Sequence, residues 1–135
     1  EPTEKIEKVY NLKGAKGAIS IAYAPEEKLL FVVSQGTDNL QILDATDGKL
    51  KADVKVGAGP LAVVWEPVRK LAYVANRGSD SVAVVDVNGN LVANLPGGSY
   101  ANHVFTDGKG TVWSVNKARG ENDPQGDHIS RYAAK

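Results

Sequence analysis

Residues 71–86 of the chain contain Tyr73-Val-Ala-Asn76, then Gly78 and Asp80, then Val82-Ala-Val-Val-Asp86. Two apolar runs of strand length, separated by a short turn with Gly and Asp, predict a pair of antiparallel β-strands. The runs are continuous rather than alternating, which is typical of strands that are covered on both faces. This stretch therefore predicts the inner part of a sheet that has neighbours on both sides.

The same pattern recurs about every 42 residues, as Phe31-Val-Val-Ser34 before it and Trp113-Ser-Val-Asn116 after it. A repeat of this length indicates an array built from one supersecondary unit. We expect four strands in each unit and call them a, b, c and d in chain order. The predicted strands are a at Ala18–Ala24, Pro60–Glu66 and Tyr100–Thr106; b at Leu29–Ser34, Leu71–Asn76 and Thr111–Asn116; c at Leu40–Asp44, Val82–Asp86 and Ile129–Ala133; and d at Leu50–Val56 and Leu91–Leu95.

Alignment of the three a strands makes two predictions about side chains. It places His103 where the other repeats have Ile21 and Val63, which predicts a polar ring at a core position. It also places a large aromatic side chain at one position of every repeat: Tyr23, Trp65 and Phe105.

Strand d differs in kind, because Leu50, Ala52 and Val54 alternate with Lys51 and Asp53. This period of two is typical of a half-exposed edge strand. Inner strands that are covered on both faces, together with a solvent-exposed outer strand, are typical of blades that stack face to face around an axis. The predicted fold is all-β, a β-propeller segment of about three four-stranded antiparallel blades.

Ahead of the first a strand, Lys5–Lys13 is predicted to form a separate strand d. The strand order is then d, abcd, abcd, abc. We therefore treat residues 1–135 as one segment with an outer strand at 5–13, a blade at 18–56, a blade at 60–95 and a blade at 100–133 that lacks its own outer strand.

Three blades are too few for a closed ring, because propellers usually have at least four. An open arc would expose two apolar blade faces, which calls for a covering partner. Two partners are considered: the N-terminal remainder of the same propeller, as a separate chain or a removed part, and a second copy of the chain. Because the chain begins at Glu1 rather than Met, we expect that processing or truncation removed a preceding part.

Composition limits the function classes. The 135 residues hold 16 basic and 16 acidic side chains, so no overall charge favours nucleic acid or an anionic membrane. No apolar run approaches the roughly 20 residues of a membrane helix, and no membrane partner is expected. Because the chain has no cysteine, it has no disulfide, thiol nucleophile or cysteine-ligated metal.

These repeats resemble the YVTN-type β-propeller repeat, and YncE-like proteins in particular. The resemblance rests on Tyr73-Val-Ala-Asn76 with the strand that follows it, and on the weaker copy at Phe31-Val-Val-Ser34. It implies a seven-bladed ring, of which this chain would form the three C-terminal blades. It also implies a bacterial, periplasmic protein with no established catalytic residues.

In this fold the d–a and b–c loops lie on one face of the disc, where propellers usually bind ligands. We predict a non-catalytic binding or scaffold module that uses this face, without a cofactor or metal. The candidate ligand-binding residues, on these loops or the third a strand, are Lys16, Gln35, Asn76, Arg77, Tyr100, Asn102, His103, Asn116, Lys117 and Arg119.

Two other functions are considered. The four cations of this set, with Tyr100 as a stacking surface, would suit a single nucleic-acid strand; the neighbouring Asp38 and Asp80 favour ordinary polar loops instead. An enzyme of the lactonase or amine-dehydrogenase kind would need other blades to complete a site around Asn102 and His103. His103 would equally suit a core position in which its ring N–H donates a hydrogen bond to a backbone carbonyl.

Overall fold

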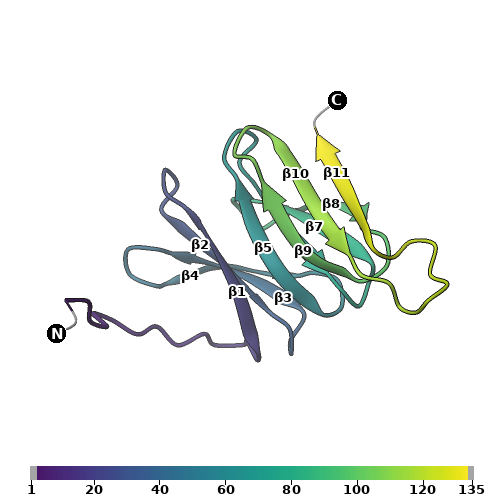
Figure 1. The fold of residues 1–135 in the computed structure, drawn as a ribbon. Helices are drawn as coiled ribbons and strands as arrows, with labels where there is room; N and C mark the ends of the chain where they lie inside the picture. Colours follow the sequence, from purple (N-terminus) through teal and green to yellow (C-terminus); the bar gives the residue numbers. More distant parts are fainter. Residues whose placement is uncertain (1–2, 134–135) are drawn as a thin grey trace.

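The computed structural model describes residues 3–133. All regular secondary structure in that range is β-strand (Figure 1). The strands form three antiparallel sheets, which we call blades 1, 2 and 3. Blade 1 contains β1 (Ala18–Ala24), β2 (Leu29–Ser34), β3 (Asn39–Asp44) and β4 (Leu50–Lys55); blade 2 contains β5 (Pro60–Glu66), β6 (Leu71–Asn76), β7 (Ser81–Asp86) and β8 (Leu91–Pro96); blade 3 contains β9 (Ala101–Thr106), β10 (Thr111–Asn116) and β11 (His128–Ala133).

The blades stack through their first strands. β5 contacts both β1 and β9, whereas β4 and β8 lie at the far ends of their sheets (Figure 1). This is the arrangement of propeller blades, with strand a at the axis and strand d at the rim. The fold is a partial β-propeller, as the repeat predicted.

Two apolar cores lie between the blades. Between blades 1 and 2 the rings of Phe31 and Trp65 stack with their centroids 5.1 Å apart, and Phe31 is wholly buried. Between blades 2 and 3, Tyr73, Val84 and Val104 pack together. Burial of each such side chain contributes roughly 1.5–3 kcal/mol, which explains why the inner strands are apolar on both faces.

The predicted outer strand at 5–13 is not a strand in the structure. An outer strand needs the N–H and C=O groups of a neighbouring strand c. The strand c without an outer neighbour is β11, which belongs to the blade at the other end of the arc (Figure 1). Residues 5–13 therefore have no β-ladder to join among residues 3–133.

The predicted alignment of the third strand a is wrong by one residue. Ala101 pairs with Asn116, just as Pro60 pairs with Asn76 in blade 2. Strand a of blade 3 therefore begins at Ala101 rather than at Tyr100.

This shift moves two side chains to the other face of the sheet, because side chains alternate along a strand. Phe105 stands at the position of Val64 rather than that of Trp65. His103 stands at the position of Ala62 and is exposed, so it is not the core residue that the alignment suggested. Both side chains lie on the open face of blade 3.

Candidate functional site

The d–a and b–c loops are joined by backbone hydrogen bonds in the same way in every blade. In each case the residue after strand b donates its N–H to the residue before strand a. These bonds place the two sets of loops side by side on one surface, which we call the loop face. They run from Gln35 to Gly17 (2.9 Å), from Arg77 to Gly59 (3.0 Å) and from Lys117 to Tyr100 (3.1 Å).

Tyr100 occupies a position that is glycine in the other two blades. Its φ is 44°, close to the 68° of Gly17 and the 60° of Gly59. Positive φ is uncommon for residues other than glycine. The Tyr100 N–H donates to a carboxylate oxygen of Asp80 at 2.9 Å, which helps to hold this backbone. The third blade thus carries an aromatic ring on the loop face where its neighbours carry none.

Two guanidinium groups lie over the Tyr100 ring. Those of Arg77 and Arg119 are 4.5 Å and 4.7 Å from its centroid, within the range of a cation–π contact. Arg119 also forms an ion pair with Asp80. Loss of solvation acts to lower the pKa of Arg119, but the charge and hydrogen bond of Asp80 together with those of Tyr100 outweigh it, so the pKa is raised. Arg119 is therefore a paired cation.

Arg77 is different, because it forms no ion pair with any of residues 3–133. Its Nε atom is buried and has no hydrogen-bond partner in that range. A buried donor without a partner is costly in a protein. Arg77 thus carries a charge that no carboxylate among the described residues pairs with.

A hollow of about 260 Å³ opens beside Arg77 on the loop face. Pockets for drug-sized ligands are roughly 300–1,000 Å³, so this one suits a small group or the end of a longer ligand. It draws residues from all three blades and is lined by Gln35, Gly59, Arg77, Gly78 and Tyr100.

The long b–c loop of blade 3 is organised by Asp123. Its carboxylate accepts bonds from the Arg119 N–H (2.9 Å), the Ser99 hydroxyl (2.9 Å) and the Gln125 N–H (3.0 Å). These bonds, the one from Arg119 first, lower the pKa of Asp123. The loop is thereby folded against the d–a loop and places Arg119 beside Tyr100. Sequence reasoning named Arg119 but not the carboxylate that positions it.

Of the ten predicted ligand-binding residues, the hollow brings together Gln35, Arg77 and Tyr100, with Arg119 against the same ring. Lys16 and Lys117 are exposed and do not line it. Gly59 and Gly78 line it but were not predicted, because a glycine has no side chain to suggest a role.

Asn76 and Asn116 are buried beneath the loops. Asn76 donates to the Ser81 hydroxyl at 3.2 Å, and Asn116 donates to the Ser130 hydroxyl at 3.0 Å. A Cβ on Gly57 would lie 2.9 Å from the Asn76 side chain, so that loop rests directly on it. Both asparagines support the loop face from below.

Asn102 and His103 lie on β9 and do not line the hollow. The Asn102 side-chain oxygen is buried without a partner among residues 3–133. Within the same range, no three His, Asp or Glu side chains are grouped so that they could hold a metal ion. The structure thus separates these two residues from the loop-face set.

The fold and the loop face together define this chain as a partial β-propeller. Among solved structures, the chain is similar to hydrazine synthase of Kuenenia stuttgartiensis, with a TM-score of 0.69 and 24% identity. The match covers 83% of this chain but 32% of that one, so this chain spans about a third of its length. A likeness at this identity shows the fold alone.

No protein-family model matches the chain, and no curated protein matches it either. Over the described residues there is also no helix that is long and apolar enough to cross a membrane.

Proposed function

We propose that the chain is a non-catalytic binding module that takes a small anionic group, such as a carboxylate or a phosphate, on its loop face. This proposal rests on the missing hydrogen-bond and ion-pair partners of Arg77. Arg77 lines a hollow, its buried Nε has no hydrogen-bond partner among residues 3–133, and it makes no ion pair with them.

The neighbours of Arg77 favour an anion as the missing partner. A guanidinium presents several donors in a planar fork that matches a carboxylate or phosphate. Asp80, which accepts from the Tyr100 N–H, is already paired with Arg119. The Tyr100 ring holds Arg77 by a cation–π contact, and Gln35 adds an amide at the rim of the hollow.

The nucleic-acid alternative has less support. A stacked base would need the face of the Tyr100 ring, and two guanidinium groups already lie over it. The enzyme alternative rested on Asn102 and His103, which do not line the hollow. An anion bound at Arg77 would leave the two cation–π contacts of Tyr100 and the ion pair between Arg119 and Asp80 in place.

We also propose, on the residues at 31–34 and 73–76 alone, that the chain is a YVTN-repeat protein of the YncE-like kind. A seven-bladed ring and a periplasmic location are proposed on the same terms. Fractionation of cells that make the full-length protein would test the location, since recovery in the cytoplasmic fraction would contradict it.

Binding of inorganic phosphate and of acetate, followed by NMR shifts of the loop-face amides, tests the anion site. We expect saturable shifts at Arg77 and Gly78, and Arg77→Gln should weaken the affinity about tenfold or more through loss of a charged hydrogen bond. Lys117→Gln is the matched control, because it removes an exposed charge from the same face but not from the hollow. An equal loss in both variants, or no shift in the wild type, would contradict the proposal.

A further inference from the structure

We infer that the hollow on the loop face takes a carboxylate in preference to a phosphate. This inference rests on the proposed anion site and names the chemical class of its ligand. A carboxylate is planar, with two oxygen atoms and a single negative charge. A phosphate is tetrahedral, has more oxygen atoms that need donors, and can carry a second negative charge. The donors and charges that line the hollow match the first group better than the second.

The backbone N–H groups of the hollow are already used within the chain. Phosphate sites usually depend on such groups, which a glycine-rich loop or a helix N-terminus points at the ligand. Here Gly59 donates its N–H to a carboxylate oxygen of Asp38, and Gly78 donates to the Ala58 carbonyl, both at 2.9 Å. The other three lining residues also donate theirs to the chain itself: Gln35 to Gly17, Arg77 to Gly59 and Tyr100 to Asp80. The lining residues therefore leave no backbone donor for a phosphate.

The two glycines that line the hollow have a structural reason instead. A Cβ on Gly78 would lie 3.0 Å from the Ala58 carbonyl oxygen, and a Cβ on Gly59 would lie 3.3 Å from the Gly78 nitrogen. Gly59 also has a φ of 60°, which glycine adopts readily. These glycines let the d–a and b–c loops pack closely together, and they do not present N–H groups to a ligand.

Recognition therefore depends on side chains, and those with N–H donors in the hollow are Arg77 and Gln35. The guanidinium of Arg77 is a planar fork that can donate to both oxygens of a carboxylate at once. A phosphate bound in the same way would keep two further oxygens, with only the Gln35 amide left to donate an N–H to them. The donor set thus matches two oxygens better than four.

The charges around the hollow favour a ligand with a single negative charge. Arg77 is the only lining residue with a charged side chain. Asp38, which accepts from the Gly59 N–H, forms no ion pair with any of residues 3–133. A second negative charge on the ligand would meet no second cation in the hollow and would be repelled by Asp38. A carboxylate neutralises Arg77 without this repulsion.

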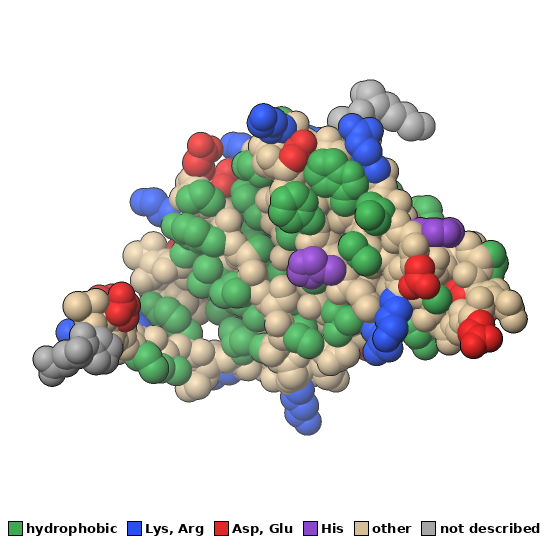
Figure 2. Space-filling model, in the orientation of Figure 1, with side chains coloured by type: hydrophobic (Ala, Val, Ile, Leu, Met, Phe, Trp, Pro, Cys, Tyr) green, Lys and Arg blue, Asp and Glu red, His purple; other side chains and the backbone are tan. Residues whose placement is uncertain are grey.

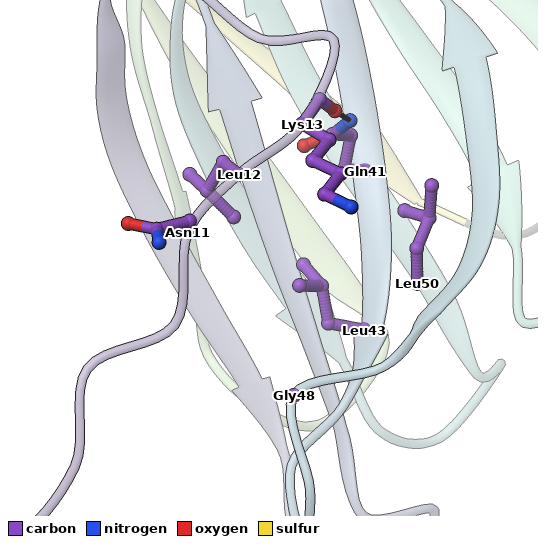
Figure 3. A pocket seen from close by; sticks show the side chains of 7 residues that line it. All are labelled: Asn11, Leu12, Lys13, Gln41, Leu43, Gly48 and Leu50. Carbon is purple, nitrogen blue, oxygen red and sulfur yellow. Dashed lines mark hydrogen bonds between the residues drawn. The ribbon is translucent and has the colours of Figure 1, made fainter.

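Two other surfaces are poorer in free donors. Figure 2 shows hydrophobic side chains spread over the face that β9 and β10 present, with Lys and Arg side chains around them. A second hollow, of about 230 Å³, lies between residues 11–13 and blade 1, with Leu43 in its wall (Figure 3). The Gln41 amide there already donates to the Lys13 carbonyl at 2.6 Å and to Asp53 at 3.0 Å. The amide of Leu43 therefore serves as an internal control for anion binding.

Titration of the protein with acetate and with inorganic phosphate, followed by NMR, tests the inference. At about pH 5.5 both anions carry close to one negative charge, so the comparison reports how their oxygens match the donors. We expect acetate to bind about threefold or more tightly than phosphate, which corresponds to one net hydrogen bond. The shifts should appear at Arg77 and Gly78 but not at Leu43. At about pH 8, where phosphate gains a second charge, the difference should widen.

Two neutral or larger probes define what is recognised. Acetamide has the shape of acetate without its charge, so it should bind about tenfold or more weakly than acetate. N-acetylglycine carries its carboxylate on a peptide group and shows the source of the ligand. Tighter binding than acetate would support the carboxyl end of a peptide chain, and equal binding would support a small free acid; either result supports a carboxylate ligand.

Gln35→Glu and Gln125→Glu form a matched pair of variants. Each adds one negative charge to an exposed side chain of the loop face, but only Gln35 lines the hollow. We expect Gln35→Glu to weaken acetate binding about tenfold or more, because like charges would then meet in the hollow. Gln125→Glu should change it by less than about twofold, because solvent and salt screen its charge.

The outcomes separate this inference from the anion site on which it rests. Saturable binding of both anions, with phosphate as tight as acetate, would overturn the inference and leave the anion site intact. Equal losses in the two Gln→Glu variants would overturn it as well, because Gln35 would then not face the ligand. No saturable shift with any anion would overturn the anion site itself, and the inference with it.

Discussion

At the residue scale, the b–c turns show how one aspartate serves two purposes. Asp38 and Asp80 adopt φ values of 52° and 53°, which Asp tolerates better than most residues. Their carboxylates leave the turn and bond to the next blade. Recurrence of these residues predicted a turn role for them. The bond to the next blade could not be predicted, because it depends on how the blades stack.

Asp38→Ala should lower the free energy of unfolding by about 2–4 kcal/mol. The change removes a charged hydrogen bond and puts a less tolerant residue at positive φ. Asp38→Asn keeps an acceptor and the tolerance of positive φ, so its loss should be about 1 kcal/mol. Urea unfolding followed by tryptophan fluorescence, to which Trp65 at this junction and Trp113 both contribute, measures the losses. Equal losses in the two variants would show that the carboxylate contributes nothing beyond turn geometry.

At the element scale, strand positions were predictable because apolar runs and turn residues recur at fixed intervals. The strand predicted at 5–13 does not form, because the part of the chain that the structure describes offers it no ladder partner. The register of strand a in blade 3 failed for another reason. A glycine, which adopts positive φ readily, precedes strand a in blades 1 and 2, whereas Tyr100 takes that place in blade 3. Local sequence rules cannot anticipate a substitution that Asp80 and two arginines hold in position.

Gly48→Ala should release the N-terminal segment from blade 1. Gly48 has a φ of 74°, and a Cβ there would overlap the Tyr10 ring. Because residues 8–13 have no ladder, they can move aside, and we expect faster hydrogen exchange at the amides of Tyr10 and Leu12.

Gly108→Ala is the matched control, because its φ is 71° and nothing lies within 4 Å of the place that a Cβ would take. Gly108→Ala should lower the free energy of unfolding by about 1 kcal/mol, because alanine is strained at positive φ, but it should cause no clash. If both variants speed exchange of the segment equally, the contact between Tyr10 and Gly48 does not hold the segment in place.

At the scale of the whole molecule, the 42-residue period predicted the partial propeller, and the structure confirms it. The candidate site was predictable only in part. The sequence supplied Arg77 and Tyr100, but the hollow between them forms only when three blades meet.

Binding of inorganic phosphate, followed by NMR shifts of the loop-face amides in the wild type and in Arg77→Gln, tests this account most directly. We predict saturable shifts at Arg77 and Gly78 in the wild type and an affinity about tenfold or more weaker in the variant. No saturable shift in the wild type, or the same affinity in both proteins, would contradict it.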